Sequence, residues 1–197
     1  MIIAIESAID GGSLSLVDRD VEIASWIGDD AQRLRAGSLI TNIENLLNSA
    51  GIEKASLRMI VVSAGPGSFT GIRIGLATAL GLKTALGIPV HGVSALDAMA
   101  FAHGHTGVVA IPMGRGGAAA QRFVNGIADG SPFSVSAADV FHLEPHGNFL
   151  AHEKLVAAAE GHRPIVNFGS NIASALAMFA GRNEPVSHAP IFISKTV

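Results

Sequence analysis

The sequence predicts an α/β fold in two lobes, and three observations support that prediction. Apolar stretches of strand length alternate with segments of helical spacing, which is typical of parallel strands joined by helical crossovers. The order of residues 1–104, three strands and then helix, strand, helix, strand and helix, returns in shortened form in residues 105–197. The composition fits a chain with a substantial core, because 49% of the 197 residues are hydrophobic and 15% are charged.

The first half opens with three short strands and an amphipathic helix. The three predicted strands cover residues 1–6, 13–17 and 21–26. Residues 38–50 then repeat leucine and isoleucine at helical spacing, with Ser38 as a candidate cap and Gly51 just past the end.

Two further strand and helix pairs complete the first half. Their strands are predicted at residues 59–64 and 89–93, and their helices end near Leu86 and His103. Parallel neighbours need crossover connections, whereas the opening strands can form a hairpin. We therefore expect a mixed sheet flanked by helices.

The second half resembles a shortened copy of the first. Its predicted strands cover residues 107–111, 121–125 and 165–168, and its predicted helices cover residues 137–141 and 171–179. Residues 126–163 mix glycine, proline, histidine and scattered acids, which predicts loops and short helices there. Duplicated lobes of this kind are the organisation of the actin, Hsp70 and sugar kinase superfamily. We therefore predict an actin-like fold with lobes at residues 1–104 and 105–197.

Composition narrows the function classes. The chain has no cysteine, so it can form neither disulfides nor thiolate metal sites, and we expect a cytoplasmic protein without a signal peptide or a membrane span. A net charge of −3 argues against binding of a polyanion such as tRNA by this chain alone. The low proportion of charge predicts that some apolar surface faces another protein.

The most informative segment is GPGSFTG, which joins a predicted strand to a glycine-rich helix. It lacks the lysine of a phosphate-binding P-loop after Gly71, the glycine of a dinucleotide fingerprint at Thr70, and the glycine of a nucleophile elbow at Pro66. Two alternatives stay open: the loop could offer backbone amides to an anion, or its glycines could simply form a tight turn. The candidate loop and anion-binding residues are Gly65, Pro66, Gly67, Ser68, Phe69, Thr70 and Arg73.

The helix after this loop carries small residues on one face. Gly71, Gly75 and Ala79 lie at positions i, i+4 and i+8, and each interior glycine destabilises a helix by roughly 1 kcal/mol relative to alanine. Such a face allows unusually close packing, either within the chain or between chains, and the low surface charge favours an interface between chains. The predicted partner-binding residues are Gly71, Ile72, Gly75, Leu76, Ala79 and Lys83.

Two other groups of residues are weaker candidates. Glu6, Ser7 and Asp10 follow the first strand and could form a nucleotide-binding hairpin or a plain turn. His103 and His105 are spaced i, i+2, which does not place both on one helical face, so we predict no metal site. We interpret the remaining histidines as surface or turn residues: His91, His142, His146, His152, His162 and His188.

The block at residues 61–99, which contains GPGSFTGIRIGLATALGLKTALGIPVHGVSALDAM, closely resembles the TsaB (YeaZ) family. The resemblance extends more loosely to the opening IIAIESA, to the first amphipathic helix and to the closing APIFISK. This family is the bacterial accessory subunit of tRNA threonylcarbamoyladenosine synthesis, also labelled glycoprotease-like or a peptidase M22 homologue.

The resemblance implies an actin-like fold with no complete active site of its own. It implies that the glycine-rich helix docks the catalytic paralogue TsaD, that the isolated chain forms a homodimer through the same face, and that TsaE supplies an ATPase. It implies no resident cofactor, although ATP or ADP with magnesium could bind at a shared interface, and contact with tRNA would be indirect.

Two segments depart from the family pattern. The family usually has a histidine and an acid where the first helix begins, whereas this chain reads Ala36-Gly37-Ser38-Leu39. In the second lobe the family tends to carry Asp-Ala-Arg, whereas residues 112–119 read PMGRGGAA, which puts nucleotide contact by that lobe in doubt. Two alternatives of another class remain: an actin-fold ATP-dependent enzyme that uses Glu6 and Asp10 at a metal, and a metal-dependent peptidase.

Overall fold

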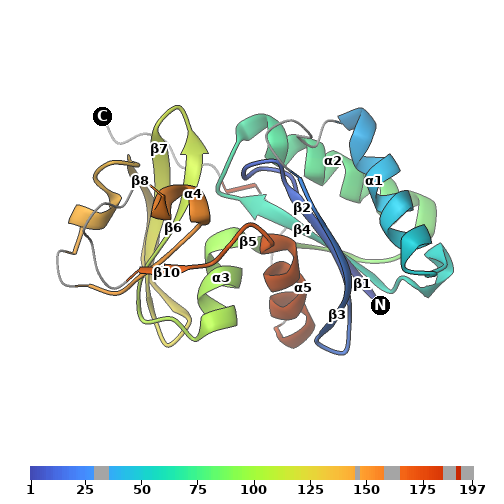
Figure 1. Cartoon of the computed structure of the whole chain (residues 1–197). Coiled ribbons are helices and arrows are strands. Elements are labelled where there is room, and N and C mark those ends of the chain that lie inside the picture. The colour runs from blue at the N-terminus through green and yellow to red at the C-terminus, as the bar shows by residue number, and fades with distance from the viewer. Residues whose placement is uncertain (29–35, 145–146, 158–164, 184–189, 192–197) are drawn as a thin grey trace.

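Two five-stranded sheets organise the protein, which is represented by a computed structural model (Figure 1). The structure describes residues 1–28, 36–144, 147–157, 165–183 and 190–191. Within these residues, no helix combines the length and the hydrophobicity that a membrane crossing needs. The α/β class predicted from the alternation of strands and helices is confirmed.

The first sheet has the mixed pairing that the sequence predicts. Its strands are β1 (Ile2–Glu6), β2 (Ser13–Asp18), β3 (Val21–Ile27), β4 (Met59–Gly65) and β5 (Val90–Ser94). Their order across the sheet is β3-β2-β1-β4-β5. Strand β1 pairs antiparallel with β2 and parallel with β4. The ends of β1 and β4 therefore lie side by side, together with the turns that follow them.

Three helices and one short 3-10 helix belong to the first half. They are α1 (Ala36–Ser49), η1 (Lys54–Ser56), α2 (Phe69–Leu86) and α3 (Ala95–His103). Ser68 caps α2, as predicted, because its side chain accepts a hydrogen bond from the amide of Gly71. Ser38 is not the cap of the first helix, since α1 already begins at Ala36, two residues before it.

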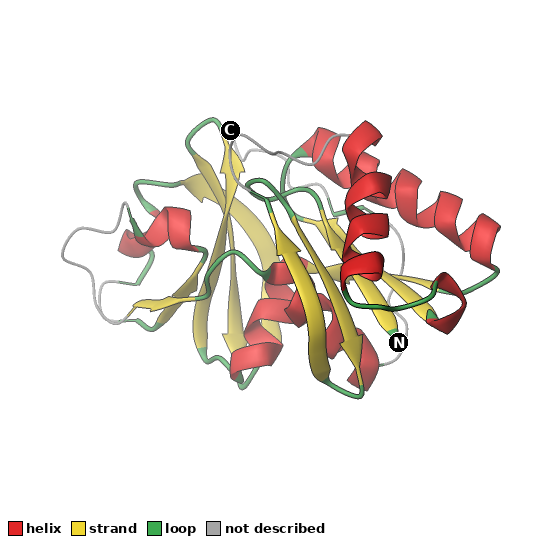
Figure 2. Cartoon of the chain, turned by 45° about the vertical axis from the view of Figure 1, so that its right-hand side comes forward, coloured by secondary structure: helices red, strands yellow, loops and turns green. Residues whose placement is uncertain are grey.

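The second sheet is larger than the sequence predicts. Its strands are β6 (Gly107–Gly114), β7 (Gly117–Val124), β8 (Ile127–Ser136), β9 (Phe149–Ala151) and β10 (Ile165–Asn167), in the order β10-β9-β6-β7-β8. The accompanying helices are η2 (Val140–His142), α4 (Glu153–Val156) and α5 (Ile172–Arg182). Figure 2 shows the two sheets, with helices between them and on their outer faces.

The expectation of loops and short helices in residues 126–163 is wrong for strands β8 and β9. Strand β8 lies at the edge of its sheet and is exposed over its first five residues, so its sequence lacks the alternation that marks a half-buried strand. Pro132 and Gly130 also argue against a strand, but an edge strand tolerates both. Pairing with β7 holds β8 in place.

The core of the described residues consists of three apolar clusters. Helices α3 and α5 pack between the two sheets and share one apolar cluster with both of them. Helices α1 and α2 cover the outer face of the first sheet, and η2 and α4 cover the outer face of the second. Helix α5 returns to the first half, where it contacts α3, β1 and β2. The division into lobes at residues 104 and 105 stays a prediction.

Candidate functional site

The glycine face of α2 packs against its own chain. Gly71, Ile72, Gly75 and Ala79 are all buried. A Cβ atom on Gly71 would overlap the carbonyl oxygen of Ser7 and lie 2.7 Å from the Cα of Ala8. A Cβ atom on Gly75 would lie 2.5 Å from the Oγ of Ser7 and 3.3 Å from a methyl group of Val62.

The preference for an interface between chains at this face is therefore wrong. The close approach that the glycines allow is internal, because α2 rests on the turn after β1 and on strand β4. Of the predicted partner-binding residues, only Leu76 and Lys83 keep accessible surface, the first half-buried and the second exposed. A leucine at position 75 would meet Ser7 and Val62 of the same chain, so Gly75→Leu should disturb the fold itself.

The opposite side of α2 is exposed and partly apolar. Phe69 is 51% exposed and Leu80 is 46% exposed, and the guanidinium carbon of Arg73 lies 3.8 Å from the centre of the Phe69 ring. A Cβ atom on Gly81 would meet nothing within 4 Å. We call this surface the outer face of α2, and it comprises Phe69, Arg73, Ala77, Leu80, Gly81 and Thr84.

The loop between β4 and α2 uses two of its amides internally. The amide of Ser68 donates a 2.7 Å hydrogen bond to the carbonyl of Ala8, and the amide of Gly71 donates to the Oγ of Ser68 at 3.3 Å. The hydroxyl of Ser7 donates to the carbonyl of Gly71 at 2.9 Å. For these two amides the tight-turn alternative therefore describes the loop better than anion binding.

A cleft of about 1140 Å³ separates the two lobes beside this loop. The turn after β1 and the start of α2 line one wall, and the β6–β7 turn and α4 line the other. The candidate residues Ser7, Asp10, Gly67, Ser68, Phe69, Thr70 and Gly71 line it, together with Arg115, Ser134 and Lys154 from the second lobe. Gly65, Pro66 and Arg73 are not among the lining residues.

The charged groups of the cleft lie close together. Lys154 forms an ion pair with Asp10, whose side chain is only 12% exposed. Asp10 has a positive φ of 46°, in the left-handed region, within the turn that follows β1. Sequence reasoning missed Lys154 because it lies on a four-residue helix in the segment that was expected to form loops and short helices.

Glu6 does not reach the cleft. It is 1% exposed, and its Oε1 accepts hydrogen bonds from the amides of Ala8 at 2.5 Å and Ile9 at 2.9 Å. Burial raises the pKa of the Glu6 carboxyl from its ordinary value of 4.5 to about 8, against the opposing effect of these two bonds. For Glu6 the plain-turn alternative therefore describes the structure better than a nucleotide-binding hairpin, because its carboxyl is enclosed within the turn.

Substitution of Glu6 by glutamine is expected to flatten the dependence of stability on pH. Because the folded-state pKa is raised, the stability that protonated Glu6 contributes is complete below about pH 4.5 and is lost as the pH rises through about 8. Glu6→Gln keeps an acceptor for both amides and stays neutral, so its stability relative to wild type should rise by on the order of 5 kcal/mol over this range. Urea unfolding at several pH values measures this change, and parallel curves for the two proteins would contradict it.

The histidines divide between buried and exposed positions. His152 is 1% exposed and caps α4, where its Nδ1 accepts the amide of Lys154 at 3.3 Å, and burial lowers its pKa. Burial also lowers the pKa of His105. The interpretation as surface or turn residues is thus wrong for His152, whereas His91 is half-buried in β5 and His142 is exposed.

Metal-ligand clusters are absent from the part of the chain that the structure describes, since no three His, Cys, Asp or Glu side chains could hold one ion there. His103 instead stacks edge-on against Phe168, with ring centres 5.4 Å apart. His146, His162 and His188 lie outside the described residues.

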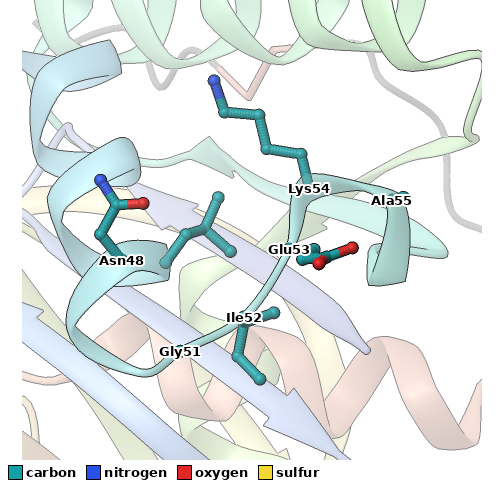
Figure 3. A pocket seen from close by; sticks show the side chains of 7 residues that line it. Asn48, Gly51, Ile52, Glu53, Lys54 and Ala55 are labelled. Carbon is teal, nitrogen blue, oxygen red and sulfur yellow. The ribbon is translucent and has the colours of Figure 1, made fainter.

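A smaller hollow of about 500 Å³ lies at the end of α1 (Figure 3). It is lined by residues 47–48 and 51–55. Lys54, in its wall, is paired with Glu44 at 2.6 Å on the exposed surface.

Comparison with known proteins gives matches to TsaD and TsaB proteins. The family model for TsaD, tRNA N6-adenosine threonylcarbamoyltransferase, matches residues 29–117, which include α2. The TsaB proteins of Bacillus subtilis and Escherichia coli are 33% and 31% identical over 99 residues, which is 50% of this chain and 43% and 42% of theirs. An uncharacterized protein of Mycobacterium tuberculosis is 39% identical over 100 residues, 50% of this chain and 47% of that protein. Over about half of its length, this chain is therefore similar in sequence to curated TsaB proteins.

Solved structures of the TsaB/YeaZ type share the fold. YeaZ from Pseudomonas aeruginosa superposes with a TM-score of 0.71 at 22% identity, over 98% of this chain and 99% of that one. A second crystal structure from that organism, described as similar to peptidase YeaZ, gives 0.69 over the same shares. The chain therefore shares the α/β fold of these YeaZ structures, and the actin-like, two-lobed assignment stays a prediction. In sequence, the chain spans about half the length of the curated relatives it matches.

Proposed function

We propose that this chain is a non-catalytic partner subunit in tRNA threonylcarbamoyladenosine biosynthesis, which docks a TsaD-type catalytic paralogue through the outer face of α2. The similarity to curated TsaB proteins supports the process, and the match to the TsaD family model supports a related partner. The proposed role needs access to tRNA, and we therefore place the chain in the cytoplasm.

The observation that carries the docking surface is the contrast between the two sides of α2. Its inner side is fixed to β4 and to the turn after β1, so the helix is a rigid platform. Its outer side presents Phe69 and Leu80, together with the small residues Ala77 and Gly81, which would let a partner helix approach closely. The neighbouring helix α1 also exposes a large apolar side chain, Ile40.

The proposal extends to the rest of the assembly. Self-association of the isolated chain would use the same outer face of α2, so that homodimer and complex exclude each other. TsaE would be the ATPase of the same assembly, and tRNA would be contacted through the partners, in keeping with the net charge of −3. A nucleotide with magnesium would need groups from a partner at a shared interface.

The residues of the cleft do not fit a magnesium nucleotide bound by this chain alone. The ATP-dependent alternative requires Glu6 and Asp10 at a metal, yet Glu6 is enclosed in its own turn and Asp10 is already neutralised by Lys154. The peptidase alternative requires a cluster of metal ligands, which the described residues do not form. We therefore favour the accessory role over both.

Co-elution of the purified chain with the TsaD protein of the same organism tests this function. On size-exclusion chromatography the mixture should give a peak that contains both chains and elutes ahead of either one alone. Two independent peaks at micromolar concentrations, with or without nucleotide, would contradict the proposed function.

A further inference from the structure

Asp10 is a carboxylate that the fold places in the cleft with little access to water. The amide of Gly12 bonds the carbonyl of Ile9 at 3.0 Å and closes the turn that carries Asp10. The amide of Ser68 in the loop donates to the carbonyl of Ala8 in this turn, and the hydroxyl of Ser7 donates to the carbonyl of Gly71 in α2. These two bonds fix the turn to the first lobe. A charged group at such a position requires a counter-charge, because desolvation without one is costly.

Lys154 supplies that counter-charge from the other lobe. Helix α4 is fixed to the second sheet, since Leu155 is buried in its outer core and the amide of His152 donates to the carbonyl of Ala110 in β6 at 3.1 Å. His152 caps the helix, and its imidazole is also buried. The ion pair between Lys154 and Asp10 therefore joins two elements that are each fixed in a different lobe.

We propose that Lys154 is a built-in counter-ion for Asp10, which holds the two lobes closed across the cleft without a bound ligand. On the far side of the cleft the lobes share the apolar cluster around α3 and α5, so the ion pair acts at the open side. The ammonium group of Lys154 is paired with the Asp10 carboxylate, which is therefore not available as a ligand for a metal cation. The outer face of α2 is then presented in one fixed arrangement, whether or not nucleotide is present.

Removal of the Lys154 ammonium group tests whether the ion pair keeps the two lobes closed. In Lys154→Met the Asp10 carboxylate loses its counter-charge, and opening of the cleft would increase its hydration. In the double variant Asp10→Asn with Lys154→Met no unpaired charge remains, so the lobes should return towards the closed arrangement. This reversal separates an effect of charge from a general loss of packing by the lysine side chain.

Pulsed electron spin resonance between the lobes measures this opening. Because the chain has no cysteine, Asn45→Cys on α1 and Ala138→Cys after β8 give two exposed and unique labelling sites. Wild type should give one narrow distance distribution that does not change with magnesium and ATP. Lys154→Met should add a population at longer distance, and the double variant should lose most of it.

Lys54→Met is the matched control, since it breaks an ion pair that lies wholly within the first lobe and on its surface. It should leave the distance distribution unchanged. If Lys154→Met yields no folded protein, Lys154→Gln provides the same neutral test with a hydrogen-bonding side chain. A wild-type distribution in both neutral variants would overturn the proposal, and so would a double variant as open as Lys154→Met. Neither result would bear on docking by α2, which co-elution tests separately.

Discussion

Replacement of Gly71 by alanine is expected to destabilise the folded chain by about 3 kcal/mol or more. The added methyl group would overlap the carbonyl oxygen of Ser7 and press on the Cα of Ala8. Both contacts are with backbone, so no side-chain rotation can relieve them. Separation of α2 from the turn after β1 would also break the hydrogen bond from Ser7 to the carbonyl of Gly71.

Gly81 of the same helix provides the control. A Cβ atom there would meet nothing within 4 Å, so Gly81→Ala should stabilise the chain by roughly 1 kcal/mol through helix propensity alone. Urea denaturation followed by circular dichroism measures both variants. Similar unfolding midpoints for Gly71→Ala and Gly81→Ala would contradict the internal packing of the glycine face.

Substitution of Ala77 by arginine is expected to weaken binding of the TsaD-type partner by roughly a hundredfold. Ala77 lies at the centre of the outer face of α2, one turn from Arg73 and between Phe69 and Leu80 along the helix. A long cation at this position would hold a partner helix away and leave a charge in a desolvated contact. Titration calorimetry with the purified partner measures the change in dissociation constant.

Two controls distinguish loss of docking from loss of folding and from a general effect of added charge. Ala77 is exposed, so Ala77→Arg should keep the unfolding midpoint of wild type. Ile127→Arg adds the same charge to a hydrophobic position that is 73% exposed in the second lobe, and it should bind the partner normally. Unchanged affinity in Ala77→Arg would remove α2 from the docking surface.

Much of the fold could be predicted because the first half is strongly patterned. Buried strands such as β1 and β4 read as continuous apolar runs, and α1 shows clear helical spacing with Gly51 just past its end. In the second half, β8 and β9 are an exposed edge strand and a three-residue strand. Such elements depend on pairing with neighbours far away in the sequence, and local composition does not reveal them.

The candidate site was predicted in part, and the error at α2 has a physical cause. The spacing of Gly71, Gly75 and Ala79 predicts close packing against this face of α2. It does not indicate whether the neighbouring segment belongs to the same chain or to a partner. The parallel pairing of β1 with β4 decides this, since it brings the turn at Ser7 to the start of α2. That pairing could have been inferred from the order of the elements.

The cleft illustrates what local sequence cannot provide. Asp10 was a candidate, but its partner Lys154 and the buried His152 lie in a segment without a recognisable pattern. Only the tertiary fold brings this segment opposite the turn after β1. Neutralisation of the Asp10 carboxylate by Lys154 follows from that contact, and neither local sequence segment predicts it.

Site-specific photo-crosslinking tests the docking surface most directly. A photoreactive amino acid at Leu80, on the outer face of α2, is compared with the same group at Val124, which is about equally exposed in the second lobe. In a mixture with the TsaD-type partner, position 80 should form a heterodimeric crosslink and position 124 should not. A crosslink from position 124 alone, or equal crosslinking from both positions, would contradict docking through α2.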